Sequence, residues 1–150
     1  LGAASLSCTL KQHDYALVSP ANRDYVYRHI IRTIPQSYLV GSFKNRLAHN
    51  LYICFQGVDG EALMLLLDAD GVAVSTGSAC NSQSLEPSTV LSAIGMDERD
   101  THSCIRMTFC GKETKEELDY VCNRLTINVE RLRSIRNAKL YPAFSDITKQ

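Results

Sequence analysis

The chain has 150 residues, 16 basic against 16 acidic, and 45% of its residues are hydrophobic. This length and apolar content suit one domain with a real core and argue against intrinsic disorder. Zero net charge argues against a basic nucleic-acid-binding protein, and no apolar run of roughly 18 residues is present to span a membrane. The chain opens at Leu1 without a signal peptide pattern, so we expect a piece of something longer.

Charge is distributed unevenly. Residues 1–50 hold six basic and two acidic residues, residues 51–119 hold four and twelve, and residues 120–150 hold six and two. The last block falls on an expected helix, with basic residues Arg124, Arg131, Arg133, Arg136 and Lys139. This pattern is typical of a solvated helix face, and a docking surface for an acidic partner protein is the alternative.

The first third of the chain is expected to be mainly helical. Residues 1–17 carry Ala, Leu and Lys at helical density, as in the tail of a longer helix. Ser19 and Pro20 predict the N-cap and first position of a new helix, which Pro35 ends. Residues 36–50 read as a loop with an extended piece at 38–40.

Short strands and helices are expected in the middle of the chain. Residues 51–55 predict a strand, and Asp59 caps a helix over about 60–69 that Gly71 closes. Residues 72–74 predict a second strand. The following ten residues, STGSACNSQS, are small or polar and predict a mobile surface loop.

The last third predicts a short helix, a turn of helix, a strand and a long helix. Pro87 starts the short helix, the turn covers 97–101 and the strand covers 104–109. Thr114 and Glu117 form a capping box for an amphipathic helix. Its apolar stripe is Leu118, Val121, Cys122, Leu125, Val129 and Leu132. The fold class is therefore α+β, a small mixed sheet with helices packed on it.

The six cysteines lie at positions 8, 54, 80, 104, 110 and 122. No pair has C-x-x-C spacing and the histidines do not cluster with the cysteines, so the pattern does not support a metal site. The domain is large enough to be stable through its core and nothing suggests secretion, so we expect no disulfide framework but reduced thiols in an intracellular protein. Five are expected to pack in the interior as small hydrophobes. Cys80 differs because its segment is polar and flexible, although no neighbouring cation lowers its pKa, and a loop cysteine without a role is the alternative.

Arg106 is the one charged residue in the strand over 104–109. A guanidinium there avoids a desolvation cost if it faces an anion or a cleft, and its fork geometry suits a carboxylate. An arginine on a solvent face is the alternative. His49 and His102 precede strands and are interpreted as caps or hydrogen-bonded core histidines.

The stretch from Gly57 to Phe109 resembles the C-terminal region of the NifS/IscS-type cysteine desulfurases. These are class V aminotransferase family members and fold-type I pyridoxal phosphate enzymes. The most specific part is STGSACNSQSLEPS, close to the motif around the family's catalytic cysteine. H-S-C-I-R at 102–106 and the downstream E-E-L-D-Y follow at the family's spacing. The resemblance runs from about residue 39 to residue 136.

The resemblance implies a mechanism and site residues. Family members take sulfur from L-cysteine with pyridoxal 5'-phosphate, leave a persulfide on a loop cysteine and release L-alanine. Cys80 matches that catalytic cysteine, and Arg106 matches the arginine that binds the substrate carboxylate. The sulfur then passes to an acceptor, such as an iron–sulfur scaffold protein.

The resemblance also implies a domain organisation. Residues 1–35 correspond to a connecting helix and helical lead-in, and residues 36–150 to the small C-terminal domain with its catalytic-cysteine loop at about 75–86. The large domain, with its Schiff-base lysine, is expected before Leu1, so this chain alone is expected to bind no pyridoxal phosphate and to be inactive. Full-length members are homodimers, and the cytoplasm or an organelle matrix is the expected location. A stand-alone sulfur carrier that accepts a persulfide on Cys80 is the alternative function.

Overall fold

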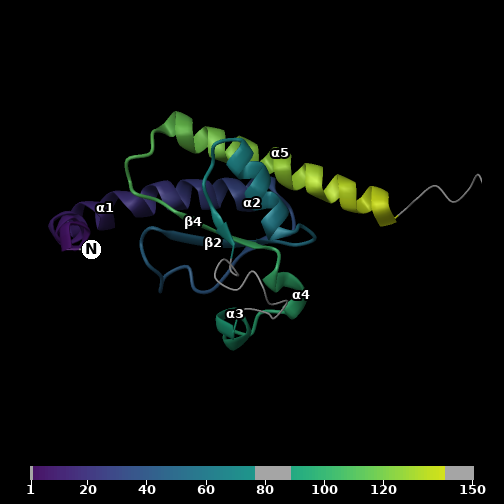
Figure 1. Ribbon diagram of the computed structural model, residues 1–150, viewed down its shortest axis with the longest axis horizontal. Coiled ribbons are helices and arrows are strands. Elements are labelled where there is room, and N and C mark those ends of the chain that lie inside the picture. The colour runs from purple at the N-terminus through teal and green to yellow at the C-terminus, as the bar shows by residue number, and fades with distance from the viewer. Residues whose placement is uncertain (1, 77–88, 141–150) are drawn as a thin grey trace, which may run out of the picture.

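The computed structural model describes residues 2–76 and 89–140. The elements in these ranges are α1 (Gly2–Thr33), β1 (Ser37–Leu39), β2 (Asn50–Phe55), α2 (Gly60–Ala69), β3 (Ser75–Thr76), α3 (Thr89–Ala93), α4 (Glu98–Thr101), β4 (Cys104–Thr108) and α5 (Lys115–Leu140). Helices α1, α2 and α5 lie on one side of the sheet, and α3 and α4 lie on the other (Figure 1).

The four described strands form one sheet in the order β1-β2-β4-β3. Every pairing among them is antiparallel. The α+β fold class is therefore confirmed, but the described sheet is antiparallel rather than mixed. Strands β2 and β4 are adjacent and antiparallel although α2, β3, α3 and α4 lie between them in the chain.

The main hydrophobic core lies between the sheet and the three larger helices. Alternation along β2 and β4 sends Ile53, Ile105 and Met107 to this side, where fully buried side chains of α1, α2 and α5 meet them. The helical contributors are Val26, Ile30, Leu63, Leu67, Leu118, Cys122, Leu125 and Val129. The apolar stripe predicted for residues 118–132 is thus confirmed as the buried face of α5.

The prediction of a helix start at Ser19 and Pro20 is wrong. Helix α1 runs unbroken from Gly2 to Thr33 with Pro20 inside it. A proline in a helix interior removes one backbone hydrogen bond. The good helix formers of residues 2–17 carry the helix through this position, so a local capping signal does not mark a boundary here.

The strand predicted at 72–74 is also displaced. The residues that pair with β4 are Ser75 and Thr76, opposite Arg106 and Ile105. Val72 and Val74 instead pack against the main core without strand pairing. The apolar residues at 72–74 therefore indicated burial in the core. They did not indicate which residues pair with β4, because that depends on the register between the strands. The polar segment that was expected to be a loop from residue 75 begins as this strand, and its residues 77–84 lie outside the described ranges.

Three predicted helix caps are confirmed. The Asp59 carboxylate accepts a hydrogen bond from the backbone N–H of Ala62 at the start of α2, and Gly71 has a φ of +79° just past its end. At α5, the Thr114 N–H donates to the Glu117 carboxylate at 2.7 Å and the Glu117 N–H donates to the Thr114 hydroxyl at 3.2 Å. This reciprocal pair is the predicted capping box.

The basic residues of α5 are only partly a solvated face. Arg124 forms a two-point contact with the Asp70 carboxylate, with both nitrogen–oxygen distances at 2.7 Å. Arg133 donates to the carbonyl oxygens of Pro35, Gln36 and Gln56 at 2.8–3.2 Å. These two arginines tie α5 to the rest of the domain, which leaves fewer cations for an acidic partner.

Of the five cysteines predicted to pack, three are confirmed and one is wrong, and the side chain of Cys8 lies outside what the structure describes. Cys54, Cys104 and Cys122 are buried, whereas Cys110 is exposed. Cys110 lies two residues after Thr108, the last residue of β4, and its backbone N–H donates to the Glu113 carboxylate. Within residues 2–76 and 89–140, no helix combines the length and apolar character needed to cross a bilayer.

Candidate functional site

The sheet face away from α1, α2 and α5 carries the candidate site. Arg106 and Thr108 alternate with the buried Ile105 and Met107 along β4, so they project to this opposite face. Among the described residues, only one end of the face is covered, by a small second cluster that contains Leu91 and partly buried Met96 near α3 and α4. Within the described ranges, the face therefore combines a closed apolar end with an open polar end.

Arg106 lies at the open end of this face. Its strand β4 is interior to the sheet, between β2 and β3, yet the residue is exposed. Among the described residues, neither a hydrogen bond nor an ion pair holds its guanidinium, in contrast to Arg23, Arg99 and Arg124. A cation held on a rigid strand with its donors uncommitted can bind an anion, and a carboxylate matches its two parallel N–H groups.

Tyr52 lies directly opposite Arg106 on β2. The backbone bonds Phe55 N–H to Ser103 O and Phe109 N–H to His49 O fix the hydrogen-bonded pairs of this ladder, so Tyr52 and Arg106 form a non-hydrogen-bonded pair. Side chains in such pairs lie closest together. Burial raises the pKa of the Tyr52 phenol to about 12, and its hydroxyl has no hydrogen-bond partner among the described residues.

The predicted catalytic residue Cys80 lies outside the described ranges. The last described residue before it is Thr76, which pairs with Ile105, the neighbour of Arg106. Three residues lie between Thr76 and Cys80, so Cys80 is four positions further along the chain, and four extended positions span at most about 14 Å. The covalent chain therefore limits how far Cys80 can lie from the strand that carries Arg106.

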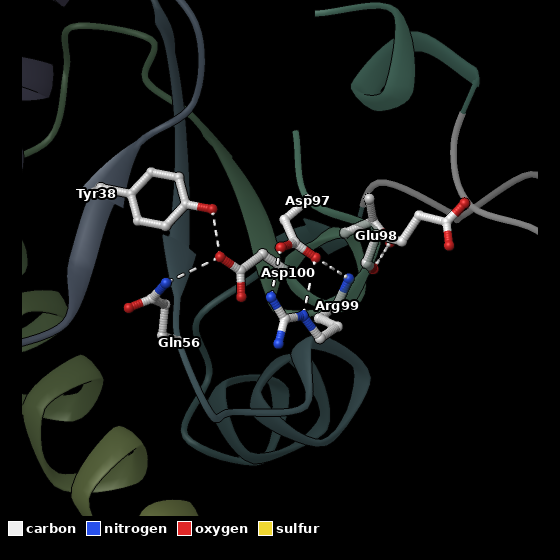
Figure 2. A network of polar contacts seen from close by, with 7 residues as sticks. Tyr38, Gln56, Asp97, Glu98, Arg99 and Asp100 are labelled. Atoms are coloured by element: carbon white, nitrogen blue, oxygen red, sulfur yellow. Dashed lines mark hydrogen bonds and ion pairs between the residues drawn. The ribbon is translucent and has the colours of Figure 1, made fainter. Parts of the chain in front are cut away.

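Asp100 in α4 joins the closed end of the site face to strands β1, β2 and β4 and to Gln56, the residue after β2. Its carboxylate accepts hydrogen bonds from the Tyr38 hydroxyl at 2.7 Å and from the Gln56 side-chain amide at 3.0 Å (Figure 2). Its carbonyl oxygen accepts from the thiols of Cys54 and Cys104, at 3.6 and 3.2 Å. Helix α4 is thereby fixed over the start of β4, two residues before Arg106.

The N-terminus of α4 is stabilised locally. Asp97 accepts hydrogen bonds from the Arg99 guanidinium at 2.8 and 3.1 Å and from the Arg99 N–H at 2.9 Å (Figure 2). The side-chain hydrogen bond with Arg99, followed by the backbone one, lowers the pKa of Asp97 to about 2. Helix α4 thus keeps a charged cap across the physiological range and holds Asp100 in place.

Neither the described lysines nor the cavity between β4 and α5 provides a fit for pyridoxal phosphate. Of the described lysine side chains, Lys44 and Lys112 are exposed, and Lys115 donates hydrogen bonds to Asp119 and Tyr25. A cavity of about 480 Å³ between β4 and α5 is lined mainly by apolar residues and by Glu113, Glu116 and Glu117. Its described lining holds no cation for a phosphate, so this cavity does not fit the cofactor.

Metal binding is not supported within the part of the chain that the structure describes. No group of three or more His, Cys, Asp or Glu side chains there is placed to hold a metal ion. The two histidines considered from the sequence lie beside the starts of β4 and β2. His102 is the exposed C-cap of α4, and the His49 carbonyl accepts the Phe109 N–H.

Sequence reasoning identified Arg106 but missed Tyr52 and Asp100. Arg106 is conspicuous as a charge in an apolar strand, whereas a tyrosine in LYICF reads as ordinary strand composition. Its position beside Arg106 depends on the register between strands more than fifty residues apart. A one-residue slip would have moved it to the other face.

Comparison with known proteins gives a consistent family match. The model of the family "Aminotransferase class-V" matches residues 19–121. Cysteine desulfurase IscS of Dictyoglomus turgidum is 47% identical over 113 residues, which cover 75% of this chain and 29% of that protein. Cysteine desulfurase IscS of Haemophilus influenzae strain Rd is 45% identical over 115 residues, covering 77% and 28%. The chain thus spans under a third of the length of these relatives.

Solved structures share the fold. A NifS-like protein from Rickettsia africae superposes with a TM-score of 0.70 at 19% identity, covering 86% of this chain and 33% of that one. Another NifS-like protein gives a TM-score of 0.69 at 22% identity, covering 83% and 30%. At these identities the likeness is one of fold.

Proposed function

The chain belongs to the aminotransferase class-V family, and from this premise we propose that it is the part of a cysteine desulfurase that supplies Arg106 and Cys80. The observation that carries the proposal is Arg106, an exposed arginine on an interior strand with no described partner. Its strand neighbours β3, which leads directly into the segment that contains Cys80. The relatives named above are cysteine desulfurases over the same region.

Arg106 is proposed to bind the carboxylate of L-cysteine. A guanidinium donates two parallel hydrogen bonds to a carboxylate, which fixes the orientation of the amino acid as well as its position. Because β4 is paired with a strand on each side, the backbone of Arg106 is anchored in a rigid element. The carboxylate would then be presented at a defined place relative to the segment after β3.

Cys80 is proposed to accept the substrate sulfur as a persulfide, with L-alanine as the second product. The assignment comes from the sequence motif around Cys80. The short stretch of chain between Thr76 and Cys80 supports the assignment. Thr76 pairs with Ile105, the neighbour of Arg106, so Cys80 and Arg106 would belong to one region of the molecule. Pyridoxal 5'-phosphate is the expected cofactor of the complete enzyme, and we assign the described residues no part in holding it.

The remaining parts of the proposal concern the complete protein. A large domain would supply the cofactor site, residues 36–150 would form the small domain, and the enzyme would be a homodimer like other family members. The persulfide would pass to an acceptor protein, such as an iron–sulfur scaffold. We propose a reducing compartment, the cytoplasm or an organelle matrix, consistent with four free cysteines among the described residues.

The test is persulfide mapping in the complete enzyme. The enzyme is incubated with L-cysteine, alkylated without reductant, digested and analysed by mass spectrometry. We expect persulfide sulfur on Cys80, its loss in Cys80→Ser, and no change in Cys110→Ser, which removes an exposed thiol outside the motif. Persulfide formation that is unchanged in Cys80→Ser would contradict the proposal.

A stand-alone sulfur carrier is the second candidate, favoured by the poor fit of the described residues to pyridoxal phosphate. The two functions differ in where the sulfur comes from. A carrier would acquire the Cys80 persulfide from an independent persulfide donor and would not need Arg106. A desulfurase part would lose persulfide formation from L-cysteine when Arg106 is replaced.

A further inference from the structure

Two buried cysteines lie side by side on the site face. Cys54 of β2 and Cys104 of β4 are direct partners in the sheet register. Their exposed fractions are 0% and 1%. The ladder pattern described for Tyr52 and Arg106 makes Cys54 and Cys104 a non-hydrogen-bonded pair as well, because the two pairs are two residues apart. In such pairs the Cα atoms are about 4.5 Å apart.

This spacing falls within the range that a disulfide can bridge. Disulfide-linked residues have Cα separations of about 4.4–6.8 Å, so the backbones need little movement. Their Cβ atoms, at about 4.5–5.5 Å in opposed antiparallel pairs, must approach to about 3.5–4.5 Å. The bond can therefore form with some strain, and strained disulfides are the more easily reduced ones.

The surroundings of the two thiols give them different roles. Both thiols donate toward the Asp100 carbonyl oxygen, and the Cys104 Sγ also lies 3.9 Å from the Met96 Sδ. Its contacts with Cys104 and then with the Tyr38 hydroxyl lower the pKa of Cys54 despite its burial. The pKa of Cys104 is raised, by its contact with Cys54 and by burial. These directions favour Cys54 over Cys104 as the thiol that ionises first.

We propose that Cys54 and Cys104 are a reversible oxidation site that forms a cross-strand disulfide with a small peroxide as oxidant. The Cys54 thiolate attacks one oxygen of hydrogen peroxide, the O–O bond breaks, and a sulfenic acid and hydroxide form. The Cys104 sulfur then attacks the Cys54 sulfur and displaces its hydroxyl group. The two thiol protons leave with the oxygens as two water molecules, and two electrons pass from the thiols to the peroxide.

The site stands apart from the desulfurase proposal, since it needs neither Cys80 nor Arg106. Among the described residues, the cover over the pair consists of the short helices α3 and α4 and the connection between them. Leu91 of α3 and Met96 of the connection pack over the pair. Short covering elements open locally at lower free energy than the core of a sheet. A small peroxide can therefore reach thiols that are buried on average.

Cys122 is a matched internal control. It is buried in the main core, burial raises the pKa of its thiol to about 11, and the other described cysteines lie elsewhere in the fold. Because thiolate character and a neighbouring thiol both favour oxidation, we expect disulfide formation at Cys54 and Cys104 to be at least about tenfold faster than oxidation of Cys122.

The experiment treats the reduced chain with limiting hydrogen peroxide, removes the peroxide, then denatures, alkylates and digests it. We expect a linked pair of peptides containing Cys54 and Cys104, lost after treatment with dithiothreitol. The link should be absent from Cys54→Ser and Cys104→Ser and retained in Cys110→Ser and Cys80→Ser. If Cys54 and Cys104 are both alkylated, or stop at sulfinic acid, at peroxide doses that oxidise Cys122, the proposal is overturned.

Discussion

The two faces of the sheet differ in the surroundings of their side chains: one is packed with apolar groups, and the other carries polar groups without described partners. On the helix-covered face, Ile53, Ile105 and Leu125 are completely buried in one continuous apolar core. On the other face, Arg106 is exposed with no described partner and Tyr52 has a buried hydroxyl without one. The same strands β2 and β4 supply both faces by simple alternation.

This difference separates stability from chemistry. Apolar burial dominates the free energy of folding, so the helix-covered face should determine whether the domain is stable. Polar groups without a described partner add no stability to the fold, and a buried one such as the Tyr52 hydroxyl lowers it, but such groups are available for binding. Substitutions on the two faces should therefore affect different measurements.

The largest expected effect comes from truncating the covered face. Leu125→Ala removes a side chain with an exposed fraction of 0% from α5. Loss of apolar burial and the resulting cavity should lower the free energy of unfolding by about 3 kcal/mol, measured by chemical denaturation. The control Leu65→Ala alters a residue that is 65% exposed and should change it by less than about 0.5 kcal/mol. Equal effects would remove the distinction between core and surface.

A smaller effect is expected where α2 approaches the start of β4. A Cβ added at Gly60 would lie 2.8 Å from the His102 carbonyl oxygen and 2.9 Å from that of Cys104. Gly60→Ala should therefore lower the free energy of unfolding by about 2 kcal/mol, because backbone must shift. Gly2→Ala, which meets nothing within 4 Å, is the control. A Gly60→Ala variant as stable as this control would show that the approach is looser than described.

A pH-dependent effect is expected at the turn before α5. Burial alone would raise the pKa of Glu113, but hydrogen bonds from Asn22 and from the backbone of Cys110 hold it at about 2. Because this pKa lies below the ordinary 4.5, the contribution is present above pH 4.5 and is lost as the pH falls toward 2.

Glu113→Gln should remove that contribution. The carboxylate is largely solvent-screened, so we expect a loss of about 1 kcal/mol at pH 7 and a smaller difference from the parent chain at low pH. Denaturation curves at several pH values measure it. If the difference in the free energy of unfolding between Glu113→Gln and the parent chain grew as the pH fell, the lowered pKa of Glu113 would be contradicted.

The smallest effect on stability is expected at Arg106. Since no described residue accepts a hydrogen bond from its guanidinium, Arg106→Gln should change the free energy of unfolding by no more than about 0.5 kcal/mol. A loss of several kcal/mol would mean that the arginine is a structural residue, and the contrast between the two faces would fail.

The sequence predicted the elements whose signals are local. The Asp59 cap, the capping box at Thr114 and the apolar stripe of α5 all depend on residues within one or two turns of each other. It also marked Arg106, because a charge within an apolar strand is visible without a fold.

Features that depend on register or tertiary packing were not predictable in this way. Pro20 lies inside α1 because the flanking residues sustain the helix, and β3 begins at Ser75 because pairing is decided by β4. The opposition of Tyr52 and Arg106, and that of Cys54 and Cys104, follows only from the alignment of β2 with β4.

The most direct test of the central claim is the KM of the complete enzyme for L-cysteine in Arg106→Gln. Loss of a charge-assisted contact with the substrate carboxylate should raise KM by about 100-fold, in a protein of unchanged stability. Thr108→Ala, on the same face of β4, serves as the matched control and should leave KM near the parent value. An unchanged KM in Arg106→Gln would contradict the assignment of this face to substrate binding.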